Sequence, residues 1–224
     1  MQYFIFDNVN SNDLGIIVKN MPLIPLAEKD IESIRISGKN GNLHIDNETY
    51  KSLNYTIDCI ISDISKIDNI KKTFNGTSKL ILSKYSDRYF EATIKNQVSF
   101  DKYLNVLQEF PLQFELQPIA YGNELIETTI SSDIDDLDIG GNTFAKPIII
   151  VDGIGILTIN NLSVQVLENG IMIDCELMNC TKNNLNANDK VVLDKFPTLN
   201  PTNNTIVIGE GINSIELKYR KRWL

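Results

Sequence analysis

Short apolar runs separated by Asn, Asp, Gly or Pro predict β-strands along most of the chain. In the first half the expected strands are 3–6, 15–18, 31–36, 55–61, 80–82, 89–94 and 112–116. Alternation is clearest over 31–36 and 113–117, where apolar residues share one face of a strand and polar residues the other. This pattern predicts an antiparallel sheet with one buried and one solvated face.

One segment departs from the strand pattern and predicts a helix. Its apolar residues recur at spacings of three and four, at Ile64, Ile67, Ile70 and Phe74. Ser62 or Asp63 can cap the start of this helix, and Gly76 can end it. Because the surrounding sequence is strand-like, we expect the helix to cover one side of a sheet as a single crossover.

The apolar density falls between Pro118 and Pro147, where the run 131–142 combines acidic residues, Gly and Ser. This composition is typical of a domain boundary. We therefore expect an N-terminal β domain over residues 1–130, a linker over 131–146 and a C-terminal β-sandwich over 147–224.

The C-terminal part repeats short strands with polar turns at the spacing of a β-sandwich. The expected strands are 147–151, 154–159, 164–167, 171–178, 191–193, 205–208 and 214–219. In the last of them, Ile215, Leu217 and Tyr219, with Trp223 beyond, have the same parity and predict one buried face.

Length and composition place the chain among soluble globular proteins, since 42% of its 224 residues are hydrophobic and 22% are charged. Residues 1–7 have neither a basic start nor an apolar stretch of secretory length, so we expect cytosolic synthesis without a signal peptide. The longest apolar run, 148–151, is far shorter than the roughly 20 residues of a membrane helix. We therefore expect no membrane association.

The chain has three cysteines, Cys59, Cys175 and Cys180, and a single histidine, His44. An odd number of cysteines in a chain long enough for a real core argues against a disulfide framework. In an extended 171–180 segment, Cys175 and Cys180 would face opposite sides of a strand and would not easily share a metal. We therefore expect neither a zinc site nor another metal site.

Residues 37–43 contain a Gly-Lys pair in the run Ser-Gly-Lys-Asn-Gly-Asn-Leu. The spacing of a phosphate-binding loop, two glycines five apart followed by Lys and then Ser or Thr, is missing. Asn40-Gly41 instead favours a tight type I′ hairpin turn, because both central positions of that turn need positive φ. We therefore expect a turn between two strands and no cofactor at this position.

The residues do not combine into a catalytic motif. The acidic run 133–138 lacks the ligands of a calcium loop, because Leu137 falls on the third ligand position and no bidentate Glu follows, so a solvated linker is favoured. No Gly-x-Ser-x-Gly motif is present, and His44, the only histidine, lies where a half-exposed strand residue is expected. The 29 acidic residues offer accidental carboxylate pairs without glycosidase spacing. We expect a non-enzymatic protein, with a small hydrolase on a β-sandwich as an alternative.

A formal net charge of −8 argues against binding nucleic acid, because phosphates would be repelled. The exception is the basic C-terminal run, where alternation would place Lys218, Arg220 and Arg222 on one face of a strand. A local basic stripe of this kind is usually a solvated surface or an interface. Trp223 follows directly, and we expect it to pack into its own sandwich rather than into a neighbouring molecule.

Several segments together resemble the distal tail (Dit) proteins of siphophages. They span nearly the whole chain, at 4–7, 10–16, 34–43, 76–89, 110–118, 145–155, 170–175, 196–204 and 220–223. The Ser-Gly-Lys-Asn-Gly core departs from the usual Pro-Gly-Arg-Asp-Gly, since Ser37 stands where proline is common and Lys39-Asn40 where Arg-Asp is common. In addition, no Gly directly precedes Phe196. These departures concern details of turns.

The resemblance implies an N-terminal domain, sandwich-like or barrel-like with one helix, followed by a C-terminal galectin-like β-sandwich. Copies of the N-terminal domain would form a homohexameric ring at the tip of a virion tail, produced in a bacterial host. This ring would join the tail tube to the tail-spike or tail-lysin hub and hold receptor-binding parts. Such a ring requires that copies of one chain contact each other head to tail, and that the repeated contact closes into a circle. The length leaves no room for an inserted carbohydrate-binding module.

The negative net charge suits a ring through which DNA slides without being gripped. A lumen lined mostly by Lys and Arg would contradict this hypothesis. The alternative function is a carbohydrate-binding module recognising cell-wall polysaccharide, since galectin-like sandwiches elsewhere stack sugars on a tryptophan or tyrosine. Trp223 is the only tryptophan and lies near the end of the chain, so the sequence offers little support for a sugar-stacking site.

Overall fold

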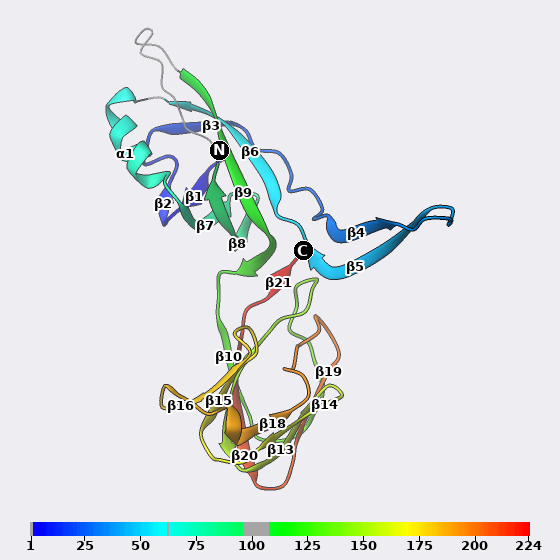
Figure 1. Ribbon diagram of the computed structural model, residues 1–224. Coiled ribbons are helices and arrows are strands. Elements are labelled where there is room, and N and C mark those ends of the chain that lie inside the picture. Colours follow the sequence, from blue (N-terminus) through cyan, green and yellow to red (C-terminus); the bar gives the residue numbers. More distant parts are fainter. Residues whose placement is uncertain (1, 62, 96–107) are drawn as a thin grey trace. The chain divides into compact units, whose positions relative to one another are not determined.

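The structure is a computed structural model that describes residues 2–61, 63–95 and 108–224. The chain forms two compact units, Met1–Ala120 with Leu224 and Tyr121–Trp223. Strands dominate both units, and a short α-helix lies in the first (Figure 1). The prediction of a mainly β protein with a helix in its first half is therefore confirmed. In the described ranges, no helix combines the length and the apolar character that a membrane crossing needs.

The first unit is built around a sheet with the strand order β2-β1-β7-β8-β9-β6-β3, which curls into a half-barrel. Its strands are β1 (Phe4–Phe6), β2 (Val9–Asn10), β3 (Ile16–Asn20), β6 (Leu53–Ile61), β7 (Thr77–Leu82), β8 (Tyr85–Ile94) and β9 (Gln108–Gly122). A separate two-stranded sheet in this unit pairs β4 (Lys29–Arg35) with β5 (Asn42–Tyr50).

Strand β6 shows why the curled sheet forms. Its odd-numbered residues are buried and its even-numbered residues are exposed or half-buried, as the 2.0-residue period of a strand requires. β6 pairs antiparallel with β9, so that Tyr55 lies opposite Phe114 and Ile57 opposite Leu112. All four side chains are buried. The alternation predicted over 113–117 therefore does mark a half-buried sheet.

The predicted helix is present, but its first turn is a 3-10 helix. This turn is η1 (Ile64–Lys66), and α1 (Ile67–Thr73) follows directly. Asp63 caps the start, because its Oδ1 accepts the backbone N–H of Ser65 at 3.0 Å. Ser62, the other predicted cap, lies outside the described residues. Asp63 is thus the cap that the structure supports.

Helix α1 packs on one side of the curled sheet through its apolar stripe. Ile70 is buried, and Phe74 directly after the helix lies 5.8 Å from Phe4 and 5.9 Å from Phe6, measured between ring centroids. Phe114 of β9 meets the same two rings from the sheet. Aromatic clusters of this kind bury large apolar areas. The prediction that the helix covers one side of a sheet is therefore confirmed.

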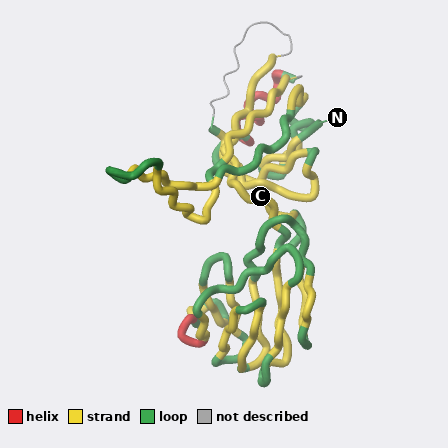
Figure 2. The backbone as a smooth tube through the Cα atoms, turned by 90° about the vertical axis from the view of Figure 1, so that its right-hand side faces the viewer, coloured by secondary structure: helices red, strands yellow, loops and turns green. Residues whose placement is uncertain are grey.

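The second unit consists of two sheets with a common core (Figure 2). The strand orders are β10-β20-β12-β15-β16-β17 in the six-stranded sheet and β11-β19-β13-β14-β18 in the five-stranded sheet. The strands are β10 (Ile126–Ile130), β11 (Ile134–Leu137), β12 (Ile148–Gly153), β13 (Gly155–Ile159), β14 (Leu162–Val166), β15 (Ile171–Asp174), β16 (Asn179–Lys182), β17 (Leu185–Asn186), β18 (Val191–Leu193), β19 (Asn204–Ile208) and β20 (Ile212–Tyr219). The last strand, β21 (Arg222–Trp223), lies outside these two sheets and pairs with β9. A 3-10 turn, η2 (Asn188–Lys190), precedes β18.

The boundary between the two units differs from the predicted one. The units separate after Ala120, whereas the sequence placed the end of the first domain at residue 130 and a linker over 131–146. β10 pairs with β20 and β11 pairs with β19, so both belong to the second unit. Ile139 and Ala145 of the expected linker are buried in its core. The segment has few apolar residues because it consists of turns and the edge strand β11, and only a few of its side chains face the core.

Two chain crossings between the sheets of the second unit meet at glycines. The Ile154 N–H donates to the Gly211 carbonyl at 2.9 Å, and the Gly209 N–H donates to the Ile156 carbonyl at 3.0 Å. A Cβ added to Gly211 would lie 2.1 Å from the Ile154 oxygen, and the φ of Gly211 is +89°. Glycine is required there because the two backbones approach too closely for any side chain.

Candidate assembly surface

The hairpin of β4 and β5 stands away from the curled sheet of the first unit (Figures 1 and 2). Every residue from 31 to 49 is exposed, including those in the centres of both strands. An isolated two-stranded hairpin is only marginally stable in water, and a third strand or another packed element is normally needed. The single chain therefore leaves this hairpin without the covering layer that such a structure requires.

The hairpin has one apolar and one polar face. Cross-strand partners share a face, so Ile34 lies beside Leu43, and Ile45 lies beside Glu32. Ile34, Leu43 and Ile45 are each 38–40% exposed, and Ile36 follows them in the loop. We call these four aliphatic residues the hairpin stripe.

The opposite face of the hairpin is mostly polar. Ser33 lies opposite His44 there, and Arg35 lies opposite Asn42. Ile31 is the apolar residue on this face. His44 is thus a strand residue, as predicted, but it is exposed rather than half-exposed. The burial predicted for one face of 31–36 is wrong for the single chain, because the hairpin lacks a second layer.

The extended segment that precedes the hairpin is held to the first unit at both ends. Met21 and Ala27 are buried, and the Tyr55 hydroxyl donates to the Pro22 carbonyl at 2.8 Å. Between these anchors, Leu23 is 69% exposed and Leu26 is 82% exposed. The segment is therefore fixed in place while two leucines point to solvent.

Ion pairs fix the base of the hairpin. Lys29 Nζ lies 2.6 Å from Asp46 Oδ2, and Lys51 Nζ lies 3.1 Å from Glu28 Oε1. The hydrogen bond from Lys29 holds the pKa of Asp46 below its usual value and raises the pKa of Lys29. Exposed pairs contribute little to stability, so their effect is to orient the hairpin rather than to hold the fold together.

The exposed large aliphatic residues of the first unit are concentrated in this region. Within the described residues of that unit they are Leu23, Leu26, Ile31, Ile34, Ile36, Leu43 and Ile45. Exposed apolar side chains gathered in one region of a folded chain are typical of an interaction site. The sequence pattern predicted the 31–36 strand, a turn after it and a strand position for His44, but not that both strands would be uncovered in the single chain.

The turn at the tip of the hairpin is wider than predicted. The strands end with the pair Arg35 and Asn42, so six residues form the loop. Positive φ occurs at Gly38, +83°, and Gly41, +82°, and Asn40 is not among the left-handed residues. A two-residue type I′ turn at Asn40-Gly41 is therefore wrong, because the loop distributes the reversal between two glycines.

The predicted positions of the cysteines need correction. All three are buried and free. Cys175 and Cys180 both belong to the core of the second unit, rather than facing opposite sides of a strand, because β15 ends at Asp174 and a turn follows. Burial raises the pKa of Cys59 and of Cys175 to about 12, so these thiols are protonated at neutral pH. Among the described residues, no group of His, Cys, Asp or Glu is arranged to hold a metal.

The acidic run 133–138 serves the backbone of the second unit. The Ile208 N–H donates to Asp133 Oδ1 at 2.8 Å, and the Asn203 N–H donates to Asp138 Oδ1 at 3.0 Å. These carboxylates fasten β11 to the β19 region rather than forming a solvated linker. A carboxylate that accepts a backbone N–H cannot be told from a solvated one by sequence alone, because the fold decides which N–H groups lie beside it.

The basic stripe predicted near the C-terminus does not form. Lys218 lies on the outer face of β20 and pairs with Glu127 at 3.2 Å. Arg220 donates to the carbonyls of Gly122 and Asn123 at 2.9 and 2.6 Å. Arg222 is only 4% exposed. The three basic side chains do not share one face of a strand, because β20 ends at Tyr219 and two residues separate it from β21.

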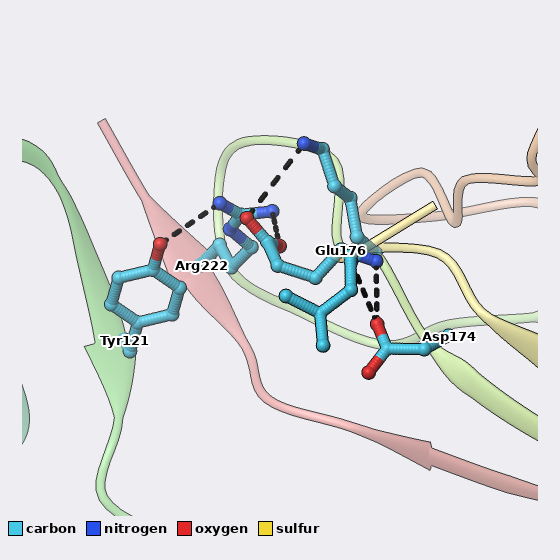
Figure 3. A network of polar contacts seen from close by, with 6 residues as sticks. Tyr121, Asp174, Glu176 and Arg222 are labelled. Carbon is cyan, nitrogen blue, oxygen red and sulfur yellow. Dashed lines mark hydrogen bonds and ion pairs between the residues drawn. The ribbon is translucent and has the colours of Figure 1, made fainter. Parts of the chain in front are cut away.

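Arg222 is the centre of a polar network in the second unit (Figure 3). Its guanidinium donates to Glu176 Oε2 at 3.2 Å and to the Tyr121 hydroxyl at 3.1 Å, and it lies 4.9 Å from the Tyr121 ring centroid. Lys146 Nζ lies 3.7 Å from the other oxygen of Glu176. The network ties the first and last segments of the unit to the turn after β15. Trp223, beside it in β21, is half-buried.

We expect Arg222→Met to lower the free energy of unfolding of the second unit by about 1–3 kcal/mol, because charge-assisted hydrogen bonds are lost. Glu176→Gln should lower it by less than about 1 kcal/mol, since the Glu176 side chain is 46% exposed and water screens its charge. Urea unfolding followed by the fluorescence of Trp223 measures both. Equal losses in the two variants would show that burial of Arg222 does not matter.

Comparison with known proteins agrees with this description of the fold. No family model matches the chain, and no curated protein matches it. Among solved structures, the crystal structure of the Dit protein of phage SPP1 matches with a TM-score of 0.78 over 100% of both chains, at 13% sequence identity. That protein is described as a paradigm of the hub adsorption apparatus in phages that infect Gram-positive bacteria. At this identity the agreement establishes a Dit-like fold.

Proposed function

We propose that this chain, which has the fold of a short phage distal tail protein, is a non-enzymatic subunit of the hub at the tail tip of a siphophage or prophage. The observation that carries the proposal is the agreement of fold over the full length of both chains. A shared fold alone does not define a function, so the exposed hairpin is the second support. Its stripe suits a protein that works by contacting other chains.

The first unit is the ring-forming part in this proposal, and six copies make a closed homohexamer. A ring needs two different surfaces on each subunit, one that reaches out and one that receives. The hairpin stripe of Ile34, Ile36, Leu43 and Ile45 supplies the first, because its side chains are exposed in the single chain. The hairpin that bears it stands away from the curled sheet of its own unit (Figure 1). Packing on the next subunit would add the layer that the hairpin lacks.

The remaining partners follow from the place of such a ring in a tail. It would join the tail tube on one side to the tail-spike or tail-lysin hub on the other, and hold receptor-binding parts. The second unit would be the galectin-like sandwich at its outside. DNA would pass through the bore without specific binding, which a net charge of −8 favours. The working protein needs no cofactor or metal in this proposal.

A carbohydrate-binding module is the competing function for the second unit. Sugar sites use exposed aromatic rings as stacking platforms. Trp223, the single tryptophan, is half-buried in β21, so no particular observation favours this alternative. Titration with host wall polysaccharide, followed by Trp223 fluorescence, would detect such binding.

Native mass spectrometry of the purified chain tests the proposed ring. We expect particles of six 25.3 kDa chains at micromolar concentration. Negative-stain images of the same sample should show rings. A chain that stays monomeric when mixed with its tail-tube protein would contradict the proposal.

A further inference from the structure

Three Asn-Gly dipeptides lie in the chain, at Asn40, Asn75 and Asn169. In such a pair the backbone nitrogen of the glycine can attack the side-chain amide of the asparagine, because glycine has no Cβ to obstruct the approach. Both residues of each pair are exposed, so water reaches the three sites alike. Since the reacting groups are also identical, any difference in reactivity comes from the hydrogen bonds that hold each pair.

Asn169 is held in a way that prevents this attack. Its Oδ1 accepts the backbone N–H of Gly153 at 2.8 Å, which fixes the side-chain amide. The Gly170 N–H, which would have to attack, donates to the Val151 carbonyl at 3.0 Å. Both reacting groups are therefore occupied, and the turn between β14 and β15 must open before they can meet.

Asn75 is held through its backbone. Its N–H donates to the Thr73 carbonyl at 3.0 Å, and the Gly76 carbonyl accepts the Ile94 N–H at 3.1 Å. Phe74, directly before it, is buried in the aromatic cluster of the first unit. Among the described residues, no hydrogen bond fixes the Asn75 side chain or the Gly76 N–H. Rotation of this pair is restricted while its reacting groups stay free, so we expect an intermediate reactivity.

Asn40 lies in the loop over residues 36–41, which we call the tip loop. A hydrogen bond within this loop, from the Lys39 N–H to the Ile36 carbonyl, is long at 3.3 Å. In the part of the chain that the structure describes, no hydrogen bond involves Asn40 or Gly41. A Cβ added to Gly41 would meet no atom within 4 Å, so its surroundings are open. Exposed loop tips of this kind are the least constrained parts of a fold.

We propose that Asn40 is a site of spontaneous deamidation, with the Gly41 backbone nitrogen as the nucleophile. That nitrogen loses its proton and bonds to Cγ of Asn40, and the bond from Cγ to Nδ2 breaks. Ammonia leaves and carries the proton away, and the two residues are then joined in a cyclic succinimide. Nothing is oxidised or reduced, so the reaction requires only water.

Water opens the succinimide at either of its two carbonyl groups. The C–N bond at the attacked carbonyl breaks, its carbon keeps the water oxygen as a carboxyl group, and the nitrogen regains a proton. Opening at Cγ gives aspartate, whereas opening at the backbone carbonyl gives isoaspartate, whose main chain runs through the former side chain. The net reaction converts Asn40 and one water molecule into an acidic residue and ammonia.

Deamidation would change the charge of the tip loop. From residue 33 to residue 45 the chain carries Arg35 and Lys39 but no acidic residue, so this end of the hairpin is basic. An exposed aspartate is ionised at neutral pH. The reaction therefore offsets one of these two positive charges, in a chain whose formal net charge is already −8. Isoaspartate also adds one carbon atom to the main chain of the loop.

In the proposed ring this change would weaken the contact made by the hairpin, and this step rests on the proposed function. The hairpin meets a subunit of net charge −8, which attracts a basic tip loop. One exposed charge alters such a contact by roughly two- to fivefold in affinity. Chains that stay unassembled would thus lose affinity for the ring with time, whereas the deamidation itself does not depend on a ring.

Peptide mass spectrometry of the purified chain tests the site directly. The chain is kept in mildly alkaline buffer for several days, and deamidation is measured in digested samples as a gain of about one dalton. We expect the initial rate at Asn40 to exceed that at Asn169 by at least about tenfold, with Asn75 between them, because opening is required at Asn169. A rate at Asn40 equal to or below that at Asn169 would overturn the proposal.

The same measurement in concentrated urea shows whether the fold sets this order. Unfolding removes the hydrogen bonds at Asn75 and Asn169, so we expect the three rates to agree within roughly threefold. A preference for Asn40 that persists at full size in urea would show that the neighbouring sequence, and not the open tip loop, causes it.

Asn40→Gln locates the reaction within the tip loop. The substitution keeps the amide but places it one carbon further from the Gly41 nitrogen, so the succinimide cannot form. We expect the mass gain of this peptide to fall at least about tenfold, with Asn75 and Asn169 unchanged. An undiminished gain would assign the reaction to Asn42 in the same peptide and contradict the proposed site.

Native mass spectrometry of aged chains tests the consequence for assembly. Asn40→Asp carries the new charge from the start, and Asn40→Gln is the matched variant that does not acquire it. We expect the aged natural chain and fresh Asn40→Asp to form ring contacts roughly two- to fivefold weaker than those of aged Asn40→Gln. Circular dichroism confirms that both variants are folded.

The outcomes separate the site from the ring. Equal affinities of all three samples would overturn the effect on assembly and leave the proposed ring intact. Hexamers absent from every sample would instead overturn the ring, while the peptide masses still decide whether Asn40 deamidates.

Discussion

The double substitution Ile34→Lys and Leu43→Lys is expected to separate the assembled ring into folded monomers. These two residues lie opposite each other in the centre of the hairpin stripe, and each is about 40% exposed in the single chain. Burying them against a neighbour contributes about 1 kcal/mol each, and burying two ammonium groups in their place costs more. We expect each ring contact to weaken by about 2–4 kcal/mol, which is roughly 30- to 1,000-fold in affinity.

The fold of the single chain should not change, because exposed substitutions usually alter stability by no more than about 0.5 kcal/mol. Ser33→Lys with His44→Lys is the matched control, since this pair lies next to the first but on the opposite face. It introduces the same two charges into the same strands. Native mass spectrometry should show monomers for the first variant and hexamers for the control. Hexamers in both would exclude the hairpin stripe as the ring contact.

Gly211→Ala is expected to destabilise the second unit by about 2–5 kcal/mol. The φ of Gly211, +89°, is unfavourable by about 1–2 kcal/mol for a residue with a Cβ. That Cβ would also lie 2.1 Å from the carbonyl oxygen of Ile154, a backbone atom that cannot move without breaking the crossing between the sheets. Overpacking of this kind adds about 1–3 kcal/mol.

Gly170→Ala separates the two causes. Gly170 has a φ of +76°, close to that of Gly211, but a Cβ there would meet no atom within 4 Å. We expect it to lower the stability by only about 1–2 kcal/mol. Urea unfolding followed by Trp223 fluorescence measures both variants, because the single tryptophan lies in the second unit. Equal losses would show that close backbone approach adds nothing at Gly211.

The strand pattern was readable in the sequence wherever one face of a strand is buried inside the same chain. β6, β9 and β20 are examples, because alternation of apolar and polar residues reports which side faces the core. The helix could be predicted in the same way, since Ile70 and Phe74 repeat at helical spacing and both are buried. Local periodicity suffices for these elements because each buried face is continuous along a single segment.

The position of the unit boundary and the burial of Arg222 could not be predicted in this way. Residues 126–130 join the second unit only because they pair with β20, about ninety residues later. Arg222 is buried only because Glu176 and Tyr121, distant in sequence, surround it. Charge and polarity along the chain say what a side chain prefers, not which partner will be available. Such partners are set by long-range pairing.

By itself, the sequence determined that this is a β-rich chain with one predicted helix in its first half, because strand and helix periods are local properties. It also marked Ile34 and Ile36 as apolar, and from that alone we expected them to be buried. Only the tertiary structure decided that the hairpin bearing them stands uncovered, that the boundary falls after Ala120, and that glycines close the crossings. The reason is physical: alternation shows that a face is apolar, whereas its cover comes from chain segments far away in sequence or from another molecule.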